Sequence, residues 1–150
     1  MTCIHRTTML MGALLLSMVA APHVVTAAEL TVADVELVSG LKNVKEVAKG
    51  SIPGAGGNVN FARADGTLLV LVTIAASSDY SEAVKMFDKR TQVSGVGEEA
   101  FIPADAPWAL YARSGSKFVG IGGGLDPKSG MPILSTAQIQ QLAKIVFSRL

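Results

Sequence analysis

The chain has 150 residues, with 13 basic and 12 acidic side chains and a formal net charge of +1. This near neutrality excludes the strongly basic surface that nucleic-acid-binding proteins present to phosphates. The single cysteine excludes an internal disulfide.

Residues 1–28 predict a secretory signal peptide. A short polar start precedes an uncharged run at 9–21, and small residues lead up to Glu29. This order of segments is typical of a leader, and cleavage after Ala27 or after Ala28 fits it equally well. The uncharged run is shorter than the roughly 20 apolar residues that span a bilayer, so an uncleaved anchor is the weaker alternative. We therefore expect a periplasmic or secreted protein without a membrane span after cleavage.

Cleavage would leave residues 29–150, a length typical of a single domain. It would remove the only cysteine and both histidines, Cys3, His5 and His23, and leave 12 basic against 12 acidic residues. Ser-His-Asp and Cys-His catalysis would then be excluded, as would zinc and copper sites built on imidazole or thiolate. We expect no cofactor.

The first predicted helix starts after Thr31 and stops at Gly40. Thr31 is a suitable N-cap, and glycine favours the left-handed turn that follows a helix. Leu30 and Val35 flank this start with the spacing of a hydrophobic staple.

A second helix is predicted at 79–90. Asp79 and Glu82 have the spacing of a capping box, with Asp in place of Ser or Thr. Lys89 and Arg90 would lie in the last turn, where the helix dipole favours cations.

The C-terminal helix has the strongest pattern. Ser135 and Gln138 form a capping box, and Leu134 and Ile139 form the staple around it. One apolar stripe with helical spacing then runs to the end of the chain: Ile139, Leu142, Ala143, Val146, Phe147 and Leu150. Such a stripe is expected to pack on a sheet.

The remaining segments predict strands. Residues 58–76 form a hairpin with Asp65-Gly66 as its two-residue turn, and 107–123 form a second hairpin. The run 68–74 is almost wholly apolar, so we expect a central strand covered on both faces. The segment 44–47 adds a short edge strand. The prediction is an α+β fold: an antiparallel sheet of four to six strands with three helices packed on it.

The segment 94–101, SGVGEEAF, most resembles a functional motif. A phosphate-binding loop needs glycines that open a helix, whereas Gly95 and Gly97 follow a helix and lead towards a strand. We interpret the segment as a turn in which these glycines permit a positive φ and Phe101 enters the core.

Two alternatives assign chemistry to the acidic residues of this segment. Glu98 or Glu99 could be the base of a histidine-free, carboxylate-dependent hydrolase or lyase, although extended neighbours point to opposite faces. Glu98, Glu99 and Asp105 could also hold calcium, which takes oxygen ligands, although no EF-hand loop is present. We predict no metal site, and both alternatives stay open at this point.

The candidate binding residues lie in the glycine-rich loops and among the aromatic side chains. Trp108 and Tyr111 are the aromatic pair best suited to a contact surface, because residues three apart on a strand face opposite sides. The glycine-rich segments 50–58, with Pro53 and Asn58, and 120–130 could form the rim of a groove. The leading hypothesis is a non-enzymatic binding or accessory domain for an envelope protein or a small ligand.

With the step Gly40-Leu41 and the segment GVGEEAF at 95–101, the chain resembles the small exported domains of the PsbP-like and LpqN-like group. The resemblance covers residues 30–150. It implies an α/β sandwich with a binding or accessory role outside the cytoplasm, and it brings no catalytic residues. Cys3 precedes the apolar run, so the lipidated cysteine of many actinobacterial members is missing, which favours a soluble protein.

Overall fold

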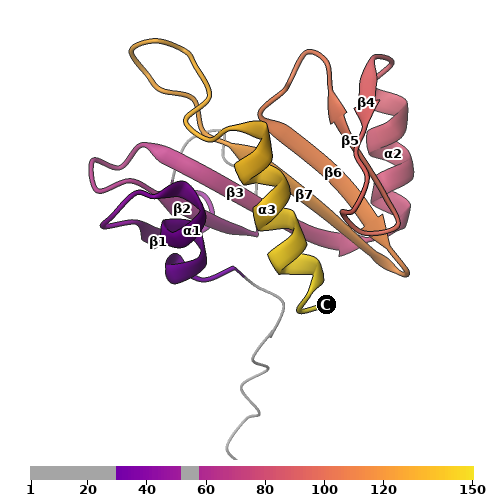
Figure 1. Cartoon of the computed structure of the whole chain (residues 1–150), viewed down its shortest axis with the longest axis horizontal. Coiled ribbons are helices and arrows are strands. Elements are labelled where there is room, and N and C mark those ends of the chain that lie inside the picture. Colours follow the sequence, from indigo (N-terminus) through magenta and orange to yellow (C-terminus); the bar gives the residue numbers. More distant parts are fainter. Residues whose placement is uncertain (1–29, 52–57) are drawn as a thin grey trace, which may run out of the picture.

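One seven-stranded antiparallel sheet forms the centre of the computed structural model, which describes residues 30–51 and 58–150 (Figure 1). The strand order is β1-β2-β3-β7-β6-β5-β4, and every neighbouring pair is antiparallel. The strands are β1 Lys45–Val47, β2 Val59–Ala62, β3 Leu68–Ala76, β4 Arg90–Gln92, β5 Glu99–Pro103, β6 Ala109–Ser114 and β7 Lys117–Gly123. The predicted α+β class is confirmed. The sheet has one strand more than the four to six predicted, because β4 is short, fully exposed and without an apolar alternation.

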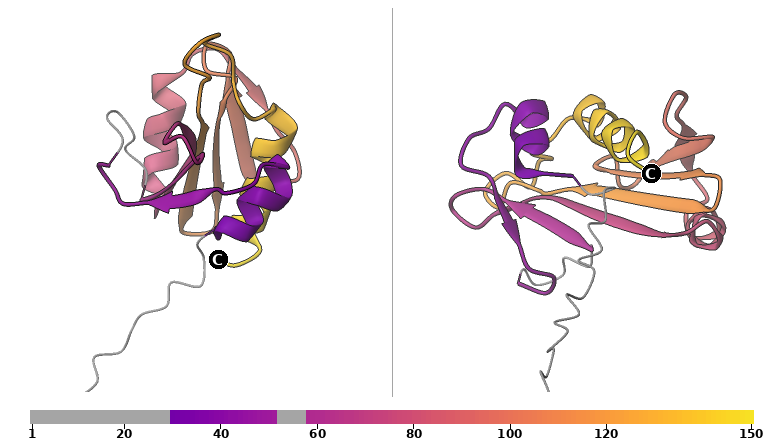
Figure 2. Two further views of the ribbon diagram at one scale, coloured as in Figure 1. Left: turned by 90° about the vertical axis from the view of Figure 1, so that its left-hand side faces the viewer. Right: turned by 90° about the horizontal axis from the view of Figure 1, so that it is seen from below.

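Three helices cover the two faces of this sheet unequally. Helices α1 (Val32–Ser39) and α3 (Thr136–Phe147) lie on one face, and α2 (Ser78–Met86) lies on the other (Figure 2). At 1.5 Å per residue, α2 is about 14 Å long. Seven strands spaced by roughly 4.8 Å make a sheet roughly 29 Å wide. Helix α2 is therefore too short to cover its whole face.

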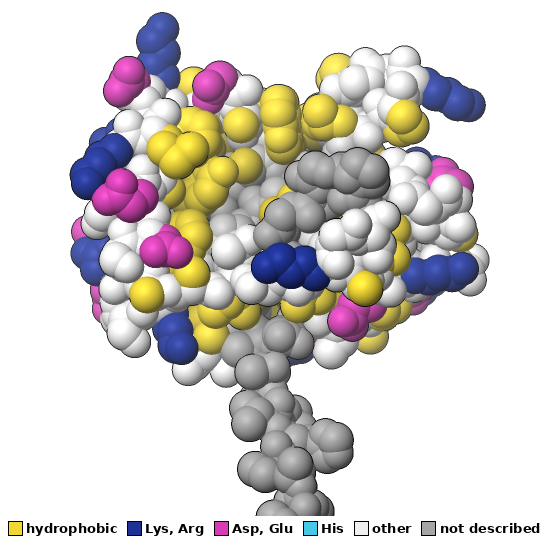
Figure 3. Space-filling view, turned by 180° about the vertical axis from the view of Figure 1, so that it is seen from behind, with side chains coloured by type: hydrophobic (Ala, Val, Ile, Leu, Met, Phe, Trp, Pro, Cys, Tyr) yellow, Lys and Arg dark blue, Asp and Glu magenta, His cyan; other side chains and the backbone are white. Residues whose placement is uncertain are grey.

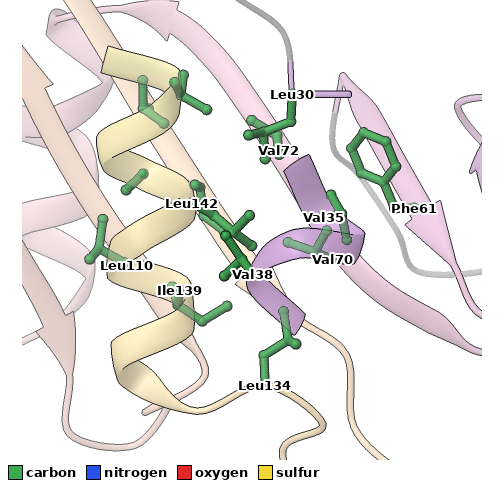
Figure 4. Close-up of a cluster of buried hydrophobic side chains, with 14 of the residues drawn as sticks. Leu30, Val35, Val38, Phe61, Val70, Val72, Leu110, Leu134, Ile139 and Leu142 are labelled. Atoms are coloured by element: carbon green, nitrogen blue, oxygen red, sulfur yellow. The ribbon is translucent and has the colours of Figure 1, made fainter. Parts of the chain in front are cut away.

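The main core lies between the sheet and the pair α1 and α3 (Figure 4). Alternate residues of the central strands point into it, among them Val70 and Val72 of β3 and Leu110 of β6. The first four residues of the predicted stripe on α3 have no exposed surface: Ile139, Leu142, Ala143 and Val146. Phe147 is only partly buried and Leu150 is 43% exposed, because the helix ends at Phe147 beside the margin of the sheet.

Both predicted capping boxes are present. At α1, the Thr31 hydroxyl accepts from the Asp34 backbone N–H at 3.3 Å, and the Asp34 carboxylate accepts from the Thr31 N–H at 2.8 Å. Gly40 follows the helix with a φ of 73°. At α3, Ser135 and Gln138 make the same reciprocal pair. These helix ends are specified by neighbours three residues apart, which is why the sequence predicts them.

The predicted start of the second helix is wrong. Its N-cap is Ser77, which makes no side-chain capping bond, and the helix begins at Ser78. Glu82 instead pairs with Lys85 at 2.8 Å, one turn further along.

The predicted end of this helix is also wrong, since it stops at Met86 and Lys89 and Arg90 lie beyond it. Phe87 turns to an extended conformation and joins an aromatic cluster beneath the helix. From β4, Arg90 Nη1 still donates to the Phe87 and Val84 carbonyls at 2.7 and 3.1 Å. The Arg90 guanidinium therefore contacts the end of α2 from the strand β4, and not from the last turn of the helix as predicted.

The two hairpins have turns of different length. In the first, Gly66 N–H donates to the Arg63 carbonyl and Arg63 N–H to the Thr67 carbonyl, so a three-residue loop replaces the predicted two-residue turn. Gly66 has the positive φ that this loop needs. In the second, Ser114 pairs with Lys117, so the turn consists of Gly115 and Ser116 alone and is shorter than the turn around Ser114-Gly115-Ser116 that the sequence suggests.

Strand β3 is central, as predicted, but in its middle the described helices cover one face only. Val70 and Val72 are buried beneath α1 and α3, whereas Leu71 and Thr73, which point to the α2 face, are partly exposed. The predicted burial on both faces is corrected here, because α2 does not extend over these residues.

The predicted signal peptide and Pro53 lie outside the described residues. Among the residues that are described, no helix is long and apolar enough to cross a bilayer.

Candidate functional site

Two glycines of β7 face the α2 side of the sheet: Gly120, which is buried, and Gly122, which is half-buried. Gly120 and Gly122 alternate with Val119 and Ile121, which point into the main core. Across the sheet, Gly120 stands between Thr73 and Tyr111, and Gly122 between Leu71 and Ala109. A strip of bare backbone one strand wide therefore runs between two rows of side chains.

This strip is the floor of a hollow of about 400 Å³. Its side-chain lining comes from β3, from β7 and from the start of β6: Leu71, Thr73, Trp108, Ala109, Tyr111 and Phe118. None of these lining residues carries a charge at neutral pH. Figure 3 views this face and shows hydrophobic side chains gathered on it. The volume and the apolar lining of the hollow fall within the range of small-molecule sites.

Glycine is required to keep the hollow this deep. A Cβ on Gly120 would lie 3.4 Å from Phe118 Cζ and 3.7 Å from Tyr111 Cδ1, which is ordinary contact distance. A Cβ on Gly122 would lie 3.2 Å from Leu71 Cγ and would crowd that side chain. A larger side chain at Gly120 would have to displace the two rings, and one at Gly122 would have to displace Leu71 or enter the hollow.

Tyr111 belongs to an aromatic cluster beneath α2 as well as to the hollow. Its ring lies 5.3 Å from Phe87, 5.4 Å from Phe101 and 6.1 Å from Phe118, measured between centroids. Burial raises the pKa of the Tyr111 hydroxyl, and the nearby Asp105 carboxylate raises it further. Tyr111 is therefore neutral at physiological pH and fixed in position by its neighbours.

Trp108 is half-buried and belongs to neither core cluster. Its carbonyl accepts from the Gly123 N–H at 2.7 Å, which holds it beside the end of β7. Because Trp108 precedes β6, the alternation expected between positions 108 and 111 does not apply. The structure brings Trp108 and Tyr111 together at one hollow.

The other predicted contact residues are placed differently. Asn58 is exposed and does not line the hollow in the described structure; its Oδ1 accepts from the Ile74 N–H at 2.7 Å. Its own N–H donates to the Val72 carbonyl, so Asn58 ties the start of β2 to β3.

The glycines of SGVGEEAF form a turn into β5. Gly95 and Gly97 have φ values of 76° and 59°, and Phe101 is fully buried. A Cβ on Gly97 would lie 2.5 Å from the Arg113 carbonyl oxygen, so close backbone approach requires glycine there. These observations confirm the interpretation of the segment as a turn.

Glu98 and Glu99 both reach Arg113. Glu99 makes two hydrogen bonds to its guanidinium, at 2.9 and 3.2 Å, and Glu98 Oε2 lies 3.6 Å from Nη1. The hydrogen bond from Arg113 lowers the pKa of Glu99, which makes it a weaker general base. In the part of the chain that the structure describes, no three His, Cys, Asp or Glu residues are grouped to hold a metal ion.

Asn60 is a residue that sequence reasoning did not single out. It is the one buried polar side chain among the described residues, and neither amide atom has a hydrogen-bond partner. It pairs with Leu71 across β2 and β3 and so points to the α2 face. In the sequence it is the polar residue between Val59 and Phe61, both of which are buried in the main core.

Gly120 and Gly122, from the segment 120–130 that was expected at a groove rim, form the floor of the hollow, whereas its wall from β3 was not predicted. The spacing Gly-x-Gly at 120–122 within an apolar strand, next to the apolar run 68–74, was the available indication.

Comparisons of the chain with protein-family models, with curated proteins and with solved structures found no match. The resemblance to the PsbP-like and LpqN-like group therefore stays a prediction.

Proposed function

We propose that this chain is a non-enzymatic binding domain that acts in the periplasm or outside the cell. Its ligand is a small, uncharged, apolar molecule held in the hollow above Gly120 and Gly122. The observation that carries the proposal is the strip of bare backbone between apolar walls. The predicted leader supports the location.

The chemistry of the lining favours an uncharged ligand. A charged group placed there would lose its hydration without meeting an opposite charge, which is costly. An apolar group gains roughly 25 cal/mol for each Å² that it removes from water. The hollow thus selects against ions and for apolar surface.

The same lining offers little for acid–base catalysis. Among the described lining residues Tyr111 is the one titratable side chain, and burial raises its pKa still further above the neutral range. Glu98 and Glu99, the residues of the carboxylate hypothesis, are paired with Arg113 and are not among those that line the hollow. Binding is therefore the better-supported role.

The test uses the only tryptophan of the chain as a reporter. Trp108 lines the hollow, so an uncharged apolar dye such as N-phenyl-1-naphthylamine should quench its emission and gain energy from it. Gly120→Ala should weaken binding by about fivefold or more, since a methyl group forced into a filled site costs about 1 kcal/mol or more. Fluorescence titration measures both dissociation constants.

Leu37→Ser is the matched control. Leu37 is 77% exposed on α1, on the opposite face, so this change removes an exposed apolar group without touching the hollow. The control should bind the dye as the wild type does, and urea unfolding should show that Gly120→Ala is folded. Dye binding that survives Gly120→Ala unchanged, or that falls in Leu37→Ser, would contradict the proposal.

A further inference from the structure

On the basis of this proposed function, we propose further that the buried part of the ligand is an uncharged aromatic ring. The ring would sit in the hollow, against Tyr111 and Phe118. Three features of the lining lead to this class of ligand: the orientation of two rings, their rigidity and the polar groups that surround them.

The first feature is the arrangement of ring atoms around the floor. The rim carbons Cζ and Cε1 of Phe118 and Cδ1 of Tyr111 lie nearest to the point where a Cβ on Gly120 would stand. The two ring planes are 9° apart, so the rings are almost parallel. The hydrogens on an aromatic rim carry partial positive charge and attract the negative face of another ring. An aliphatic group has no such face.

The second feature is that this aromatic wall exists before any ligand arrives. Tyr111 stacks on Phe101, which has no exposed surface, and Phe87 packs against both rings. A wall that is already fixed loses little side-chain entropy when a ligand binds. A ligand ring would extend the cluster without reordering it.

The third feature is a pair of polar groups without a protein partner, which belong to two residues that line the hollow. In the described structure, neither the Thr73 hydroxyl nor the Trp108 indole N–H makes a hydrogen bond to protein. These groups can bond a neutral substituent such as a hydroxyl or a ketone. No lining side chain is charged, so a carboxylate or an ammonium on the ligand would have no counter-ion there.

The experiment compares benzyl alcohol with cyclohexylmethanol, two uncharged alcohols of similar size. Emission of Trp108 is recorded at an excitation wavelength that neither alcohol absorbs. We expect benzyl alcohol to bind about two- to tenfold more tightly, the gain that aromatic pairs make beyond buried area. Apolar area alone would favour cyclohexylmethanol. Tighter binding of benzyl alcohol would therefore indicate a contact specific to the aromatic ring.

Two variants assign this preference to Tyr111. Tyr111→Phe keeps the ring and should keep the preference, whereas Tyr111→Leu should bind the two alcohols within about twofold of each other. Circular dichroism checks that both variants are folded. A preference that persists in folded Tyr111→Leu would overturn the assignment.

The outcomes separate the two proposals. Equal binding of the alcohols by the wild type, or tighter binding of cyclohexylmethanol, would overturn the aromatic inference and leave the binding role intact. If neither alcohol nor the naphthylamine dye changes the emission of Trp108, the binding role itself fails.

Discussion

At the scale of one residue, Asn60 is a buried polar side chain without a hydrogen-bond partner. Its carboxamide is fully buried on the α2 face and has no hydrogen-bond partner, a state that costs about 1–3 kcal/mol. Asn60→Leu keeps a similar size and removes both polar atoms. We expect this variant to unfold at higher urea concentration, with a gain in stability of about 1–3 kcal/mol. A loss of stability would show that the amide contributes a bond to the folded state.

A second prediction at this scale separates backbone strain from close contact in the turn before β5. Gly95 and Gly97 both have positive φ, but a Cβ on Gly95 meets only Lys144 Nζ at 4.0 Å, whereas one on Gly97 meets backbone at 2.5 Å. Gly95→Ala should cost about 1–2 kcal/mol, the cost of the left-handed conformation for an L-residue. Gly97→Ala should cost clearly more, because the Arg113 carbonyl must also move.

Urea unfolding of the two variants measures the difference. If both variants lose the same free energy of unfolding, the turn around Gly97 can relax. Close contact with the Arg113 carbonyl would then not be the reason that position 97 requires glycine.

At the scale of elements, an ion pair joins the start of α1 to the end of the chain after α3. Arg149 Nη1 and Nη2 lie 2.7 and 2.8 Å from the two oxygens of Asp34, which is also the N3 residue of the α1 capping box. The hydrogen bond from Arg149 is the main cause that lowers the pKa of Asp34 from 3.8 to about 2. One carboxylate therefore both caps α1 and anchors the C-terminal segment.

This pair predicts a specific pH dependence. Because the pKa of Asp34 is lower in the folded than in the unfolded chain, its contribution is present above pH 3.8 and is lost as the pH falls to about 2. Asp34→Asn should lower stability at neutral pH by about 1.5–3 kcal/mol, the scale of a hydrogen bond to a charged group. The variant should also lose less stability than the wild type when the pH falls from 3.8 to about 2. Thermal unfolding across this range measures both effects.

Glu46→Gln is the control, since Glu46 lies on the exposed edge strand β1. It should leave the acid dependence almost unchanged. If Asp34→Asn loses as much stability on acidification as the wild type does, the pair does not contribute as proposed.

At the scale of the whole molecule, the unequal cover of the two sheet faces is the decisive feature. Helices α1 and α3 close one face, whereas α2 closes only part of the other. The strand order places β3 beside β7, although the two strands are far apart in the chain. The hollow therefore combines a wall from β3, a floor from β7 and a wall from the start of β6.

Much of this arrangement follows from local sequence. The caps at Thr31 and Ser135 act within three residues of the chain, and the stripe on α3 repeats within each turn, so both helices could be predicted. The β6–β7 hairpin follows from two short apolar runs and the tight turn that joins them. Helix α2 was placed correctly, but its ends were not, because Phe87 and Arg90 are held by contacts with the aromatic cluster and with the helix end.

The sequence by itself determined the α+β class, the two capped helices, the β6–β7 hairpin and the glycine turn before β5, because each depends on residues close together in the chain. The tertiary structure alone decided which face of β3 stays open and that Trp108 and Tyr111 share one hollow with Gly120 and Gly122. Periodicity shows that a strand is apolar on both sides but not what packs on each side. Here a nine-residue helix covers only part of one face of a seven-stranded sheet, and the proposed site lies on the part of that face that the described helices do not cover.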